Sequence, residues 1–98
     1  MINQRDKPIA NPLVVLREEF DDWAVLFNPD TARAVGINPV GVAVWKGMDG
    51  KSSLEKIVSG IRDCFEGVSD NILQEVTSFV NTLAEEGFVG FELESDRQ

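Results

Sequence analysis

The chain has 98 residues, of which 43% are hydrophobic and 27% charged, as expected of one globular domain with a single modest core. Its formal net charge of −8 disfavours binding to nucleic acids or anionic membranes, because both require a cationic surface. Residues 1–11 lack the apolar run of a signal peptide, and no stretch reaches the roughly 20 apolar residues of a membrane span. We therefore expect a cytoplasmic protein that binds neither nucleic acid nor membrane.

The side chains that most often carry catalysis are scarce. The sequence contains no histidine and a single cysteine, Cys64, so Ser-His pairs, Cys-His pairs and an internal disulfide are excluded, and a zinc site is disfavoured. The glycines are scattered and form neither a phosphate-binding loop nor a dinucleotide fingerprint. The carboxylates gather around predicted turns and helix ends, as is typical of a solvated surface. We predict a protein that is not an enzyme and that uses no cofactor and no metal.

The beginning of the chain predicts an arm followed by a hairpin. Residues 1–11 are mostly polar and are expected to form a loose, flexible arm. Two short apolar runs follow, Leu13–Phe20 and Trp23–Phe27, and both are of the strand type. Asp21-Asp22 separates them, which is acceptable turn chemistry although weaker than Asp-Gly.

A third strand is expected to complete an antiparallel meander. The stretch Asn28-Pro29-Asp30-Thr31 is a strong turn signal, because proline presets the backbone and the acidic and amide side chains bond to nearby main chain. The strand Arg33–Ile37 follows. Its Ala34 and Gly36 share one face, and such small residues allow another molecule to approach the backbone closely.

Capping signals predict the first two helices. Asn38 can cap the first helix and Pro39 suits its first position, so this helix is expected to run to about Met48. Ser52 and Glu55 have the spacing of a capping box, which predicts the start of the second helix at Ser52.

The last helix is predicted from Ser69 or Asp70 to Glu86, with Gly87 ending it. Its apolar positions form two adjacent stripes, although one stripe is enough to pack a helix on a small domain. One stripe is Ile72, Val76, Phe79 and Leu83, and the other is Leu73, Thr77, Val80 and Ala84. The second stripe either widens the contact with the core or lines a groove.

The element order predicts an α+β, winged-helix-like fold. It is a three-stranded antiparallel meander followed by three helices, with a short C-terminal strand or wing in residues 88–94, where apolar and acidic residues alternate. We place a single domain at residues 12–94 and expect residues 95–98 to be frayed.

Several motifs, in this order, resemble the PqqD family of peptide-modification chaperones, also called RiPP recognition elements. They are Asn11-Pro12, Leu26-Phe27-Asn28-Pro29-Asp30, Ile37-Asn38-Pro39-Val40-Gly41, Val44-Trp45, Asp49-Gly50, the helix start Ser52–Val58 and the run from Val76 to Phe88. Each motif also has an explanation in folding, so the resemblance depends on their order and spacing. Residues 15–23 are similar to the ScmD-like subfamily of the SynChlorMet cassette, and this similarity implies a radical SAM enzyme as a neighbour.

The resemblance implies a binding mode for a precursor leader peptide. The leader adds as an extra strand beside the third strand, in the groove between that strand and the last helix. The strand side of this groove would be Arg33, Ala34, Val35, Gly36 and Ile37. The helix side would be Leu73, Thr77, Val80, Asn81 and Ala84. The Arg33 guanidinium either pairs with a carboxylate of the peptide or is an ordinary exposed charge.

Two other functions share the predicted fold. A protein–protein adaptor that reads no peptide would have the same acidity and the same lack of catalytic groups. A winged-helix transcription regulator is disfavoured, because residues 69–87 contain no lysine or arginine to contact phosphate. The unpaired strand edge could also pair with a second copy of the chain, so a homodimer is a further alternative.

Overall fold

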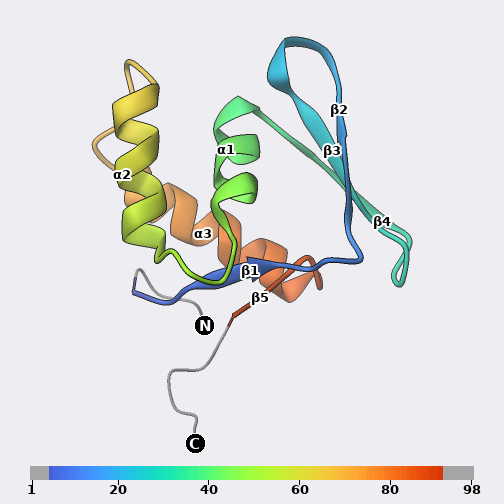
Figure 1. The fold of residues 1–98 in the computed structure, drawn as a ribbon. Helices are drawn as coiled ribbons and strands as arrows, with labels where there is room; N and C mark the ends of the chain where they lie inside the picture. The colour runs from blue at the N-terminus through green and yellow to red at the C-terminus, as the bar shows by residue number, and fades with distance from the viewer. Residues whose placement is uncertain (1–4, 92–98) are drawn as a thin grey trace, which may run out of the picture.

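The described part of the chain has an α+β fold. The computed structural model describes residues 5–91. The elements are β1 (Pro8–Ala10), β2 (Val15–Glu18), the 3-10 turn η1 (Phe20–Asp22), β3 (Ala24–Asn28), β4 (Arg33–Ile37), α1 (Pro39–Gly47), α2 (Leu54–Cys64), α3 (Ile72–Glu85) and β5 (Val89–Phe91). Figure 1 shows the helices gathered together with the sheet of β2, β3 and β4 beside them. The predicted meander, three helices and short C-terminal strand are confirmed.

The meander is antiparallel in the order β2-β3-β4, with Val15 opposite Phe27 and Ala24 opposite Ile37. The β2–β3 connection is the 3-10 turn η1, in which Asp21 and Asp22 have φ angles of 56° and 66°. Aspartate enters this left-handed region more readily than most residues, which explains how the Asp-Asp joint closes the hairpin.

The predicted start of α1 is confirmed in detail, and that of α2 is displaced by one residue. The Asn38 side chain accepts a hydrogen bond of 2.8 Å from the Gly41 N–H, and Pro39 is the first helical residue. For α2 the cap is Ser53, whose Oγ accepts from the Lys56 N–H. The predicted cap, Ser52, instead donates its N–H to the Asp49 carboxylate in the preceding loop.

The start of α3 lies later than predicted, and its end agrees with the prediction. Ser69 accepts the Asn71 N–H through its Oγ in a local turn, so the helix begins at Ile72 rather than at Ser69 or Asp70. At the other end Gly87 has a φ angle of 84°, the left-handed conformation that terminates helices.

The expectation of a loose arm is wrong for residues 8–10, which form β1. This strand pairs antiparallel with β5, and together they make a second, two-stranded sheet (Figure 1). Its other edge is also bonded, because the Ala10 N–H donates to the Met48 carbonyl and the Gly50 N–H to the Pro8 carbonyl. Main-chain bonds to both neighbours therefore order a segment that has no hydrophobic periodicity of its own. Residues 92–98 of the predicted wing and tail lie outside the described residues.

The core lies between the inner face of the three-stranded sheet and the helices. Buried residues of β3 and β4, such as Leu26 and Ile37, cluster with those of all three helices and with Phe88 after α3. Trp45 of α1 is buried in the same core. The inward face of the sheet is thus buried in the core, and the outer edge of β4 remains accessible at the surface.

Candidate functional site

The outer edge of β4 is unpaired. Within residues 5–91, β4 pairs with β3 on one side and with no strand on the other. The outward side chains on this strand are small: Ala34 and Gly36 are exposed, whereas Val35 is half-buried and Ile37 buried. A Cβ built on Gly36 would meet nothing within 4 Å, so the space beside this residue is open.

The hydrogen-bond pattern identifies which main-chain groups face outward. The Glu19 N–H donates to the Trp23 carbonyl over 2.7 Å, so the main-chain groups of Trp23 point towards β2. Because N–H and C=O groups of successive strand residues point to opposite edges, those of Ala24 and Leu26 point towards β4. Their partners Ile37 and Val35 therefore bond inward. The main-chain groups of Ala34 and Gly36 are left facing the open edge.

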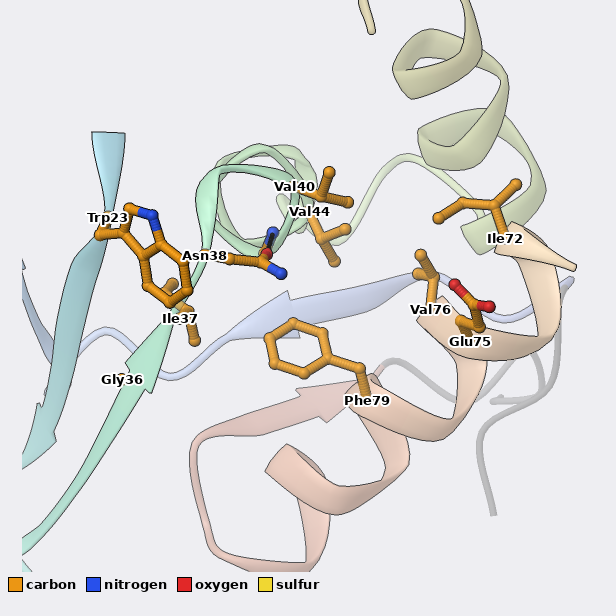
Figure 2. A pocket seen from close by; sticks show the side chains of 11 residues that line it. Trp23, Gly36, Ile37, Asn38, Val40, Val44, Ile72, Glu75, Val76 and Phe79 are labelled. Atoms are coloured by element: carbon orange, nitrogen blue, oxygen red, sulfur yellow. Dashed lines mark hydrogen bonds between the residues drawn. The ribbon is translucent and has the colours of Figure 1, made fainter. Parts of the chain in front are cut away.

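An apolar cavity of about 330 Å³ lies at the C-terminal end of this edge. Residues from the end of β4, the first turns of α1 and the first half of α3 surround it (Figure 2). Its lining is Trp23, Gly36, Ile37, Asn38, Val40, Gly41, Val44, Ile72, Glu75, Val76 and Phe79. In Figure 2 the Phe79 ring projects from α3 towards the space between Ile37 and Val76. Glu75 is the only charged residue of this lining, and no cation of the described residues lies within ion-pair distance of it.

The helix face that lines the cavity is the first apolar stripe, not the second. Of the residues predicted for the helix side, none lines the cavity. Val80 is completely buried in the core, so its side chain is not on a groove surface. Leu73 and Ala84 are partly buried against the core. The Thr77 hydroxyl donates to the Leu73 carbonyl, and the Asn81 amide donates to the Thr77 carbonyl, so both polar side chains are bonded to their own helix.

An ion pair spans the other end of β4. The Arg33 Nη1 atom lies 2.8 Å from Oε1 of Glu86, the residue that follows α3. Arg33 therefore has a carboxylate partner within the chain, in addition to remaining largely exposed. The pair connects the start of β4 with the end of α3. The cavity lies at the opposite ends of the same two elements, between the end of β4 and the beginning of α3.

The asparagine motifs that carry the resemblance have structural roles. The side chains of Asn11 and Asn28 both donate to the carbonyl of Gly87, over 2.9 and 3.1 Å. The Asn28 Oδ1 atom also accepts from the Asp30 N–H within the β3–β4 turn. These bonds tie two segments of the sheet region to the end of α3. Asn11 and Asn28 thus position the sheet region relative to the end of α3, whereas Asn38, from the third asparagine motif, lines the cavity.

Outside the edge of β4 and the cavity, the described residues hold few candidates for a metal site, a reactive cysteine or a perturbed carboxylate. In the described residues no group of histidine, cysteine or acidic side chains has the arrangement to hold a metal ion. Cys64 is free and exposed. Backbone N–H donors, first that of Lys51 and then that of Ser52, lower the pKa of Asp49. Among the helices of residues 5–91, none has the length and apolarity needed to span a membrane.

Comparison with known proteins places these features in a family. Residues 24–89, from the start of β3 to the start of β5, match the family model described as coenzyme PQQ synthesis protein D (PqqD). A solved structure titled "TbiB1 in Complex with the TbiA(beta) Leader Peptide" has a similar fold, with a TM-score of 0.68 and 23% identity over 90% of this chain and 99% of that chain. None of the curated proteins matches the sequence. Because the family model covers well over half of the chain, this protein belongs to the PqqD family.

Proposed function

We propose that this protein binds the leader segment of a ribosomally made precursor peptide along β4 and presents it to a peptide-modifying enzyme. The observation that carries the proposal is the open edge at Ala34 and Gly36, directly beside an apolar cavity. An unpaired edge offers main-chain hydrogen bonds to an extended peptide, and a neighbouring pocket selects one of its side chains. The protein itself would take no chemical part in the modification.

The geometry defines what such a peptide would meet. Two residues of β4 present outward main-chain groups, so the augmented ladder would be short. The cavity would supply most of the apolar contact, through the exposed Trp23 and the half-buried Phe79 and Val40. We place the helix side of the site on these cavity residues instead of on Leu73, Thr77, Val80, Asn81 and Ala84.

The comparisons support this proposal at the level of family and fold. The chain belongs to the PqqD family, and the protein of similar fold is titled as a complex with a leader peptide. The similarity of residues 15–23 to a SynChlorMet subfamily makes a radical SAM enzyme our proposed partner. A cytoplasmic location follows from the same proposal, because precursor modification of this kind precedes export.

Replacing Gly36 by proline tests the edge directly. Gly36→Pro removes an N–H that faces outward, and proline is tolerated at edge positions whose N–H is not bonded within the sheet. We expect leader affinity to fall about tenfold, the equivalent of about 1.4 kcal/mol for a lost main-chain bond. Fluorescence anisotropy with the labelled leader of the precursor encoded beside this chain's gene provides the measurement.

Gly36→Ala is the matched control, because it keeps the N–H and its Cβ meets nothing within 4 Å. It should retain affinity within about twofold, and thermal unfolding should show that both variants are folded. Val35→Pro is unsuitable, since that N–H faces β3 and its loss would damage the sheet. Equal affinities for Gly36→Pro and the wild type would refute binding along this edge. A wild-type Kd weaker than roughly 1 mM, with or without the enzyme, would favour the adaptor function instead.

A further inference from the structure

The β2–β3 connection carries the most exposed aromatic side chain of the described residues. We call residues 19–23 the hairpin tip. Phe20 is 86% exposed and Trp23 is 51% exposed, although large apolar residues usually seek the interior. Figure 1 shows this connection at one end of the three-stranded sheet, opposite the β3–β4 turn. The tip therefore presents two aromatic rings at one end of the molecule.

The exposure of Phe20 follows from an ordered backbone. The Glu19 N–H donates to the Trp23 carbonyl over 2.7 Å, and the Trp23 N–H donates to the Phe20 carbonyl over 3.0 Å. Between them Asp21 and Asp22 both adopt positive φ angles, which aspartate tolerates better than most residues do. A hydrogen-bonded turn thus leaves the Phe20 side chain exposed. Neither burial nor chain disorder accounts for its position.

The charges around the tip are only partly compensated. Glu18 pairs with Lys46 of α1, and Glu19 pairs with Arg17. Among the described residues, no cation lies within ion-pair distance of Asp21 or Asp22. The surface thus consists of exposed aromatic rings flanked by two unpaired carboxylates. A second copy of this chain would bring the same negative charges together, and an anionic membrane would also be repelled.

We propose that the hairpin tip is the docking site for the peptide-modifying enzyme, which would receive Phe20 in an apolar pocket rimmed by lysine or arginine. Exposed aromatic residues are frequent anchors of protein interfaces, and surrounding charges select the partner. Trp23 belongs both to the tip and to the cavity lining beside β4. An enzyme docked on the tip would consequently contact the end of the leader groove. The proposal rests on the proposed function, since that function supplies the need for an enzyme.

The test compares Phe20→Ala with a matched control, Phe27→Ala. Phe27 is also an exposed phenylalanine, at 41%, but it lies on β3 away from the tip. The probe is the purified peptide-modifying enzyme encoded beside this chain's gene, titrated with and without the leader. We expect Phe20→Ala to weaken enzyme binding at least about tenfold and Phe27→Ala less than about twofold. Asp21→Asn with Asp22→Asn, which removes the charges and keeps side chains that tolerate positive φ, should also weaken binding, and wild-type affinity should fall with added salt.

Leader affinity distinguishes failure of this proposal from failure of the proposed function. Phe20→Ala should bind the leader as the wild type does, with an unchanged unfolding temperature. If the leader binds but Phe20→Ala and Phe27→Ala affect enzyme binding equally, or the enzyme does not bind, the tip is not the docking site. If the enzyme binds through Phe20 but the leader does not bind, the docking proposal stands and the peptide function fails. If the wild type sediments as a dimer and Phe20→Ala as a monomer, the tip contacts a second copy of this chain instead of the enzyme.

Discussion

The two ends of the three-stranded sheet are built in opposite ways. At the end with the β3–β4 turn, the buried Asn28 side chain donates to the Gly87 carbonyl, and Arg33 pairs with Glu86. At the other end, the hairpin tip exposes Phe20 and is joined to α1 by an exposed ion pair of 3.4 Å between Lys46 and Glu18. We call the first the anchored end and the second the open end.

The two ends thus have different roles. Residues of the anchored end hold the site together, and residues of the open end can contact other molecules. The anchored end fixes the distance between the start of β4 and the end of α3, so the space between strand and helix is held from one side. The open end contacts α1 but leaves the apolar side chains of Phe20 and Trp23 on the surface. Asn28 builds the anchored end, whereas the surfaces suited to partners lie at the groove and the open end.

Removing the buried anchor should have the largest effect on stability. Asn28→Ala leaves the Asp30 N–H without its acceptor and removes one of two donors to the Gly87 carbonyl. We expect the free energy of unfolding to fall by about 2 kcal/mol, as measured by urea denaturation.

Asn11→Ala is the control for Asn28→Ala, because Asn11 donates to the same carbonyl from a more exposed position. We expect Asn11→Ala to lower the free energy of unfolding by about 1 kcal/mol. Equal costs for the two variants would show that burial of Asn28 adds nothing, and a cost below about 0.5 kcal/mol for Asn28→Ala would contradict the idea of an anchored end.

The Arg33–Glu86 ion pair should contribute much less than Asn28. Both side chains are partly solvated, so screening limits their attraction to an interaction energy of about 0.5 kcal/mol. A double-mutant cycle of Arg33→Ala and Glu86→Ala, repeated at low and high salt, measures this energy. We expect it to diminish with salt. An interaction above about 2 kcal/mol would mean that the pair, and not Asn28, holds this end.

The contrast between the ends also shows where sequence reasoning succeeds. Local signals located the turn at Asn28-Pro29 and the helix start at Asn38-Pro39, because proline and side-chain caps act within a few residues. The strand β1 was missed, because its order comes from bonds to Met48 and to β5, both distant in sequence. Such bonds leave no periodic pattern in a segment as short as residues 8–10.

The choice between the two stripes of α3 could not be made from the sequence. Both stripes are apolar and adjacent, so either can face the core. Helix α3 contacts α2 and β5, Val80 is completely buried, and the adjacent Phe79 lines the cavity beside β4. That outcome depends on where other elements lie. The strand β4 itself, with its exposed small residues Ala34 and Gly36, was predictable from the sequence, whereas its role as a peptide-binding edge stays a prediction.

A third kind of anchor, Asp49, combines local hydrogen bonds with an exposed position and should have the smallest effect. The Lys51 and Ser52 N–H groups donate to its carboxylate and lower its pKa below the ordinary aspartate value of 3.8. The folded chain therefore keeps Asp49 ionised to lower pH than the unfolded chain does. Its contribution to stability is complete above the ordinary pKa and is lost as pH falls through the lowered one.

An NMR titration of the Asp49 carboxyl carbon, with the Lys51 and Ser52 amide protons as reporters, checks the direction of this shift. The three signals should share a midpoint below the ordinary value, because both amides donate to the titrating group. In Asp49→Asn the two amides should lose that transition, and stability should depend slightly less on pH below the ordinary aspartate pKa. A shared midpoint at or above 3.8 would show that the exposed loop is not an anchor. The buried bonds of Asn28 would then be the model for anchoring in this fold, and exposed polar bonds would not.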